Sequence, residues 1–340
     1  MKECFREICD DQDLYNNLEF KTKLLRIYIR YIVIIFGLKN GFKILNFSLF
    51  FLKRNNFTYT YYLLKINIFR LNYIFELSMN NYVNAIKIKK LWSEYVASNS
   101  VSATNKANAN FYLNVVSENY EIINRTINHK RGKFYIYGPG CKHDPNPIYH
   151  EFTLVHLKPS PKIYSSFKSE ILILNSYYFT NFIKGNIEAI KSLTDRYSKI
   201  YLTCMTSNLP EGFKRINLNN NGYISSEMAL QRTLLFLSES YKKPECVIEG
   251  FNFYLKKDAY SNKNYHKLTR QNNGKIIEQE LCLALAEHDF LFNFIFTKKI
   301  MNKIKLKDSD EFKGIINLTN EEYMQKLFKI RDFTSLRNIR

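Results

Sequence analysis

Short apolar runs in the second half of the chain restrict its fold more than any other feature of the sequence. Polar or helix-forming segments separate these runs, and each run is too short to form a helix of its own. The clearest are KFYIY (133–137), EILIL (170–174), IYLTC (200–204) and CVI (246–248). Continuous apolar runs of this length are typical of strands that are buried on both faces of a parallel sheet.

The segment between the last two runs predicts a helix. Residues 225–240 read SSEMALQRTLLFLSES, with apolar side chains at helical spacing and serine at the start. Strands that alternate with helices indicate an α/β domain with a Rossmann-like, mostly parallel sheet flanked by helices. Such sheets bind ligands beyond the carboxyl ends of their strands. The polar residues at those ends are therefore the candidates for function.

Proline usage divides the chain. No proline occurs before Pro139, and all seven lie between that residue and Pro244. The segment 97–110 is rich in Ser, Asn and Ala, which predicts a linker or an exposed turn. We predict three regions: a basic, aromatic-rich and mainly helical region at 1–130, an α/β domain at 131–305, and a C-terminal tail at 306–340 with one or two helices around 321–330.

Positive charge is concentrated in the first region. The formal net charge is +19, and residues 21–92 contain 13 Lys or Arg against one acidic residue, Glu76. A field of this sign favours anionic partners such as acidic lipid, nucleic acid or phosphorylated substrates.

The most apolar stretch, residues 31–52, lies within this basic region. Polar residues at 39–41 and Lys43 interrupt it, so no run reaches the roughly 20 apolar residues of a spanning helix. It predicts two short amphipathic helices with aromatic faces and basic rims, which suit an anionic membrane surface. Packing of these helices on the rest of the protein is an equal alternative.

The cysteines favour a reducing compartment. All six are scattered without a CxxC pair, which argues against a disulfide framework or a structural zinc site. The first residues, MKECFREICDDQD, are too acidic and polar for a secretory signal. We therefore expect a cytoplasmic protein, peripheral to the inner face of the membrane.

Glycines and polar residues follow the predicted strands and open the predicted helix. A glycine turn lets a phosphate approach the backbone amides, and serines at a helix start can cap the helix or bind an anion. The first turn has the spacing of neither GxGxxG nor GxxxxGK[ST]. The candidates are Gly138, Pro139 and Gly140; Asn175; Ser225 and Ser226; and Gly250, Asn252 and Tyr254.

These pieces, in this order, resemble the bacterial lipooligosaccharide sialyltransferases over about residues 132–300. The family's Gly-Asn-Gly-Pro turn is matched by YGPG (137–140), and its Asn before Gln-Phe-Tyr-Phe by NSYYF (175–179). Its Ile-Thr-Ser-Gly helix start corresponds to ISSE (224–227), and its Ser-Gly-Ile-Asp-Phe-Tyr segment to EGFNFY (249–254). Tyr260 keeps the family's interval of six residues to a second tyrosine.

The resemblance implies a metal-independent glycosyltransferase with no cofactor. It would transfer a sialic acid-like or Kdo-like sugar from a CMP-activated donor to a surface glycan or glycolipid acceptor. The donor-binding residues would be Gly138, Pro139, Gly140, Asn175, Ser225, Ser226, Gly250 and Asn252. Tyr254 and Tyr260 would donate hydrogen bonds to the departing phosphate.

The resemblance also implies a histidine base in the loop after the tyrosine pair. His266 lies there, and a neutral imidazole can deprotonate an acceptor hydroxyl. Lys275 occupies the position of the family's histidine in an ungapped alignment, and His288 belongs to a further titratable cluster, 287–289. We assign the base to His266 and expect a structural role for the 287–289 cluster. Pro139 replaces the family's nucleotide-binding Asn, which leaves the donor sugar open.

Three other readings compete with this one. The first is a glycosyltransferase that uses another activated sugar. The second is a nucleic-acid-binding protein, favoured by the charge and the interleaved aromatic residues but lacking a recognition motif. The third is a metal-dependent transferase, whose DxD-like triplets would be 11–13 and 308–310. We expect neither triplet to follow a strand, so this third reading is not predicted.

Overall fold

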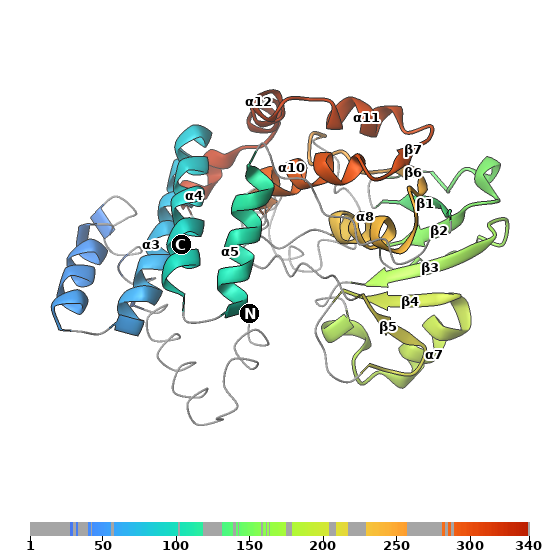
Figure 1. Ribbon diagram of the computed structural model, residues 1–340, viewed down its shortest axis with the longest axis horizontal. Helices are drawn as coiled ribbons and strands as arrows, with labels where there is room; N and C mark the ends of the chain where they lie inside the picture. Colours follow the sequence, from blue (N-terminus) through green and yellow to red (C-terminus); the bar gives the residue numbers. More distant parts are fainter. Residues whose placement is uncertain are drawn as a thin grey trace.

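The computed structural model describes most of the chain after residue 42 (Figure 1). The described residues are 28–29, 32, 40–41, 43–55, 58–100, 103–117, 131–138, 141, 143–157, 159–160, 162, 164–174, 179–203, 209–216, 229–256, 281–282, 285–286 and 289–338.

Seven parallel strands form one sheet in the order β5-β4-β3-β2-β1-β6-β7, which confirms the predicted α/β class. The four predicted runs form β1, β3, β4 and β6. Three further strands were not predicted, because they are only two to four residues long and have polar or charged members. The strands are β1 Lys133–Tyr137, β2 Thr153–His156, β3 Ser169–Leu174, β4 Lys199–Leu202, β5 Phe213–Arg215, β6 Glu245–Glu249 and β7 Lys305–Leu306.

The direction in which strands are added reverses at β1. From β1 the chain adds β2 to β5 outward on one side, and it then returns to place β6 on the other side. Ile136 in the middle of β1 is therefore in register with both Val155 of β2 and Ile248 of β6. A reversal of this kind is the point at which doubly wound sheets bind their ligands.

Helices precede, flank and follow the sheet. Residues next to two of these helices in the sequence cap their N-termini: Asn186 caps α7, and Thr319 with Glu322 forms a capping box on α12. The predicted helix at 225–240 is confirmed from Ala229 onward, and α12 confirms the helix predicted around 321–330; α11 lies before that range and was not predicted. Besides a helical stretch at 43–54, the helices are α3 Thr58–Ser78, α4 Tyr82–Asn99, α5 Ala103–Val116, α7 Ile187–Arg196, α8 Ala229–Ser240, α10 Phe290–Met301, α11 Asp310–Ile316 and α12 Asn320–Ile330; shorter turns are η1 Pro147–Tyr149, η2 Phe179–Ile183 and η3 Phe333–Asn338.

The prediction of a linker at 97–110 is wrong. Its first residues complete α4, and its last eight begin α5. The Ser/Asn/Ala composition is a weak helix signal, but Asn108 and Ala109 are fully buried, and Phe111 packs edge-on against Phe296 of α10. Burial of one helix face outweighs the modest propensity of the remaining residues.

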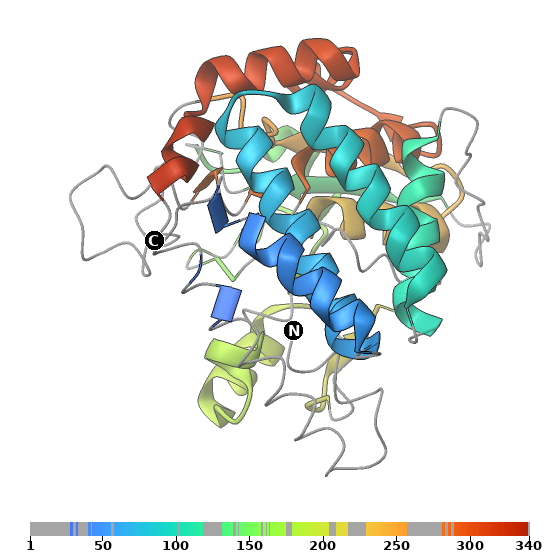
Figure 2. The same ribbon diagram turned by 90° about the vertical axis from the view of Figure 1, so that its left-hand side faces the viewer.

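One hydrophobic core runs through all three predicted regions. Phe134 and Ile136 on one face of the sheet belong to the same cluster as Tyr73 of α3, Phe294 of α10 and Leu327 of α12. Helix α10 contacts both α8 and α5, and α3, α4 and α5 lie side by side (Figures 1 and 2). The boundaries near 130 and 305 therefore do not separate independent cores. No helix among the described residues is long and apolar enough to cross a bilayer.

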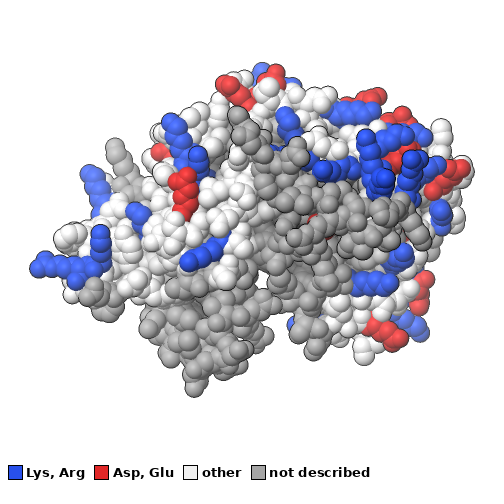
Figure 3. Space-filling model, viewed as in Figure 1, with Lys and Arg blue, Asp and Glu red and all other residues white. Residues whose placement is uncertain are grey.

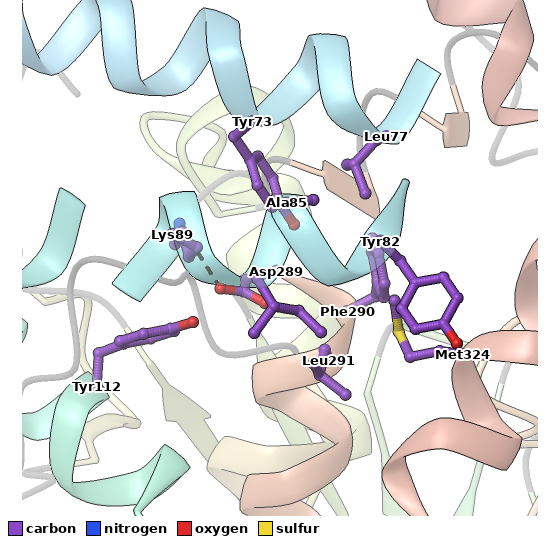
Figure 4. Close-up of a pocket in the computed structure, with 11 residues that line it drawn as sticks. Tyr73, Leu77, Tyr82, Ala85, Lys89, Tyr112, Asp289, Phe290, Leu291 and Met324 are labelled. Carbon is purple, nitrogen blue, oxygen red and sulfur yellow. Dashed lines mark ion pairs between the residues drawn. The ribbon is translucent and has the colours of Figure 1, made fainter. Parts of the chain in front are cut away.

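A buried ion pair joins α4 to the start of α10 (Figure 4). The Lys89 ammonium lies 3.6 Å from a carboxylate oxygen of Asp289, and both side chains are only 3% exposed. The ring of Trp92 lies 4.4 Å from the same ammonium, while the other Asp289 oxygen accepts the Phe292 N–H and caps α10. Burial lowers the pKa of Lys89, and Asp289 opposes this shift. Asp289 thus has the structural role expected of the 287–289 cluster.

Substitution of Lys89 by Met tests the contribution of this pair. The variant keeps the apolar stem but leaves the Asp289 charge buried without its cation, so the free energy of unfolding should fall by about 3–5 kcal/mol in urea titrations. Lys133→Met is the matched control, because it breaks the exposed pair between Lys133 and Glu151. The control should leave the urea midpoint unchanged. Equal midpoints for the two variants would contradict the assignment.

Candidate functional site

The carboxyl ends of β1 and β6 meet where the strand order reverses. The Gly138 N–H donates to the carbonyl of Glu249 at 2.9 Å, and the Cys141 N–H donates to the carbonyl of Gly138 at 3.3 Å. Two predicted donor-binding residues that are distant in sequence, Gly138 and Gly250, are thereby brought together. In Figure 1 the strands β3 and β4 point toward the N-terminal helices, so the carboxyl ends of the strands face the helical region.

Both positions require glycine. Gly250 has a φ of +73°, and a Cβ atom there would lie 2.5 Å from the Cys141 sulfur and 2.7 Å from the Cys141 nitrogen. A Cβ atom on Gly138 would lie 2.5 Å from the ring of Phe251. The two turns therefore pack so closely that only glycine fits at either position.

The segment after Gly250 adopts an unusual backbone conformation. Phe253 and Tyr254 have φ values of +48° and +66°, in the left-handed region that non-glycine residues rarely occupy. The Asn252 side-chain oxygen accepts the Tyr254 N–H at 3.1 Å, and the Asn252 carbonyl accepts the Leu255 N–H at 2.9 Å. Asn252 thus forms the turn itself, and this local role was not expected from the sequence. Two successive left-handed residues persist only where their surroundings determine them.

The C-terminal tail supplies that support. Arg331, which is 3% exposed, donates from Nε to the carbonyl of Tyr254 at 3.0 Å and from a terminal nitrogen to the carbonyl of Lys256. The Tyr323 hydroxyl donates to the carbonyl of Phe253 at 3.3 Å. Side chains at the end of the chain therefore hold the segment that carries the proposed catalytic Tyr254.

Glu249, which was not among the candidate residues, places a carboxylate at this edge. The Tyr135 hydroxyl donates to it and accepts the Asn146 N–H at 3.3 Å. Burial, and then the Glu249 charge, raise the pKa of Cys141 to about 12. The thiol is therefore protonated at neutral pH and is not an activated nucleophile. The position of Glu249 at the last residue of a strand was the available signal.

A second set of buried polar side chains links β2 to β3. His156 Nε2 is 2.7 Å from Glu170 Oε2, and the other Glu170 oxygen accepts the Tyr164 N–H at 2.7 Å. Arg196 approaches the same carboxylate at 3.9 Å and donates to carbonyls of the loop after β2. Burial lowers the pKa of His156 despite Glu170. These contacts fasten the loop after β2 beside the end of β1, where His156 is in register with Tyr137.

The expectation that no DxD-like triplet follows a strand is wrong for 308–310. The triplet comes one residue after β7, a strand too short to be read from the sequence. Its carboxylates have separate partners, since Asp308 accepts the Tyr149 hydroxyl at 3.0 Å and the 96% exposed Asp310 pairs with Lys313. Ser309 Oγ accepts the Ile248 N–H at 2.9 Å and ties the triplet to β6. Among the described residues no three His, Cys, Asp or Glu side chains group as a metal site.

The structure describes four of the candidate residues, Gly138, Gly250, Asn252 and Tyr254, in the positions given above. Their roles in donor binding and catalysis stay predictions. The remaining candidates lie outside the described residues: Pro139, Gly140, Asn175, Ser225, Ser226, Tyr260, His266, Lys275 and His288.

Comparison of the chain with protein-family models, curated proteins and solved structures gives no match. A proposal for its function therefore depends on the site geometry and on the ordered motifs of the sequence.

Substitution of Gly250 tests the packing of the two turns. Gly250→Ala must adopt a positive φ and displace Cys141, so it should lower the free energy of unfolding by more than about 1 kcal/mol. Gly314→Ala is the control, because no atom lies within 4 Å of a Cβ at that position in α11. It should stabilise the protein by about 0.5–1 kcal/mol. Urea titrations measure both, and shifts of the same sign would refute the proposed packing.

Proposed function

We propose that this chain is a glycosyltransferase that moves a sialic acid-like or Kdo-like sugar from a CMP-activated donor to a surface glycan or glycolipid. The observation that supports it best is the contact of the Gly138 and Gly250 turns at the reversal of strand order. Doubly wound sheets bind nucleotides at such points, beyond the carboxyl ends of their strands. The same two turns carry two of the motifs on which the family resemblance rests.

In this proposal the donor phosphate lies against the backbone of the two turns. Glu249 presents an acceptor and not a donor, so it would not hold the phosphate itself. Tyr254 lies four residues after Gly250. Its side chain is partly buried against the main core, and Arg331 donates a hydrogen bond to its backbone carbonyl. In this proposal the Tyr254 hydroxyl donates a hydrogen bond to the negative charge that develops on the departing phosphate, a task that a metal ion performs in other transferases. The roles of Tyr260 and His266 remain part of the proposal.

Two alternatives remain open. The same site could serve another activated sugar, because nothing described at the turns selects the base or the sugar. A nucleic-acid-binding protein is favoured by the overall charge. Four exposed lysines of the α/β region pair with acids, which weakens the positive field that a nucleic acid would meet there: Lys133 with Glu151, Lys162 with Asp144, Lys305 with Glu245 and Lys256 with Glu311.

Thermal shift measurements distinguish these possibilities. CMP and CMP-sugars should raise Tm more than UDP-sugars, GDP-sugars or oligonucleotides at physiological salt. A ligand at 100 times its Kd adds about 2.7 kcal/mol to the free energy of unfolding. A shift with UDP-sugars alone would move the assignment to another donor class, and a shift with oligonucleotides alone would reject the transferase.

Removal of one hydroxyl tests the proposed catalytic role. Tyr254→Phe preserves the ring and its packing, so donor affinity and Tm should change little. Loss of a preorganised donor to the leaving phosphate should lower kcat by about 10²–10³-fold. Tyr95→Phe in α4 is the control and should keep full activity. Unchanged kcat in the Tyr254 variant would remove this residue from the mechanism.

A further inference from the structure

Residues 43–54 form a helix with apolar side chains on two sides. On one side Leu45 and Leu49 are buried, and they pack with Leu64 and Ile68 of α3. On the other side three phenylalanines are exposed: Phe47 by 72%, Phe50 by 63% and Phe51 by 58%. The contact with α3 already accounts for the attachment of this helix, so the fold does not need the exposed rings.

The exposed residues form a continuous stripe. Lys43, Phe47, Phe50, Phe51 and Arg54 are spaced by three and four residues or are adjacent, which places them on one face of an α-helix. The stripe spans about 16 Å at 1.5 Å per residue. It begins and ends with a basic side chain, and Lys53 beside it is also exposed. We call Lys43, Phe47, Phe50, Phe51, Lys53 and Arg54 the aromatic-basic face.

This face differs from the other exposed apolar residues that the structure describes. Ile148 and Ile187 are 70% and 80% exposed, but each is single. Scattered apolar side chains are ordinary on a protein surface, whereas grouped ones mark an interaction site. The helix lies at one end of the long axis, and the α/β sheet lies toward the other end (Figure 1).

The charge around the stripe selects the partner. No acidic residue occurs between Lys21 and Phe75 in the sequence, and Figure 3 shows mostly Lys and Arg among the charged side chains at this end. A second copy on the same face would oppose like charges. An anionic bilayer offers phosphates for the basic groups and an apolar layer below them for the rings.

We propose that the aromatic-basic face binds an anionic membrane surface. Phe47, Phe50 and Phe51 insert at the boundary between headgroups and acyl chains, and Lys43, Lys53 and Arg54 lie among the lipid phosphates. The proposal does not rest on the glycosyltransferase activity, because binding is measured without substrate. If both hold, the strand ends face the side of the molecule that meets the membrane.

Vesicle sedimentation with the full chain tests this inference. The protein should sediment with phosphatidylcholine vesicles that contain 30% phosphatidylserine, and binding should decline with salt. Phe47→Ser, Phe50→Ser and Phe51→Ser should each reduce the partition coefficient about tenfold or more. Lys43→Gln, Lys53→Gln and Arg54→Gln should each reduce it about fivefold and flatten the salt dependence. Ile148→Ser and Ile187→Ser are matched controls and should bind like the wild type.

A depth measurement separates insertion from simple charge attraction. Trp fluorescence of Phe50→Trp should be quenched by lipids brominated on the acyl chain, whereas Ile187→Trp should show only the quenching of native Trp92. A triple variant carries Ser at Phe47, Phe50 and Phe51 together. Unaltered vesicle binding in this variant, with a native circular dichroism spectrum, would overturn the proposal. The proposal would also be overturned if the wild type were a dimer in sedimentation velocity and the triple variant a monomer, since that result would identify a second copy of the chain as the partner of this face.

Discussion

Backbone contact between the turns after β1 and β6 is the constraint around which the rest of this structure is arranged. Gly250 leaves no room for a Cβ atom beside Cys141, and Gly138 leaves none beside Phe251. Neighbouring strands of a parallel sheet end side by side, but their following turns touch only where side chains are absent. The contact brings two segments that are distant in sequence together at the end of the sheet where doubly wound folds bind their ligands.

Both faces of a parallel sheet must be covered, and the two covers here differ. Helices α8 and α10 contribute to the core on one face, together with the N-terminal helices. On the other face, aromatic residues from the strands and the loops beside them form one cluster, with Tyr135, Phe152 and Phe167 buried, and α7 contributes Leu193 to a second cluster. This face also receives the Glu249 carboxylate through its bond with Tyr135. The carboxyl ends of β1 and β6, with the Glu249 carboxylate, therefore lie between an apolar layer of helices and an aromatic layer of loops.

Segments far from the sheet in sequence hold the site in place. The tail contributes Arg331 and Tyr323 to the segment 252–256, and the Lys89–Asp289 pair joins α4 to α10. Removal of either support would act on the site through geometry and not through direct contact with a ligand. The aromatic-basic face has no such supporting task. For that reason its variants can be expected to change surface binding without loss of the fold.

The sequence by itself determined the strands and helices whose signal is local. Spacing and caps predict the apolar runs such as 133–137 and 246–248, the helix 229–240 and the helix of the tail around 321–330. The glycines at the strand ends can also be identified from the sequence. Only the tertiary structure decided which strands are neighbours, that α5 is a helix, and that β2, β5 and β7 exist, because their stability comes from partners distant in the chain. The same is true of the site. Gly138 and Gly250 could be named from the sequence, but the support of the left-handed Phe253 and Tyr254 by Tyr323 and Arg331 depends on contacts between residues 70 and 77 positions apart. No pattern within a segment records contacts between segments.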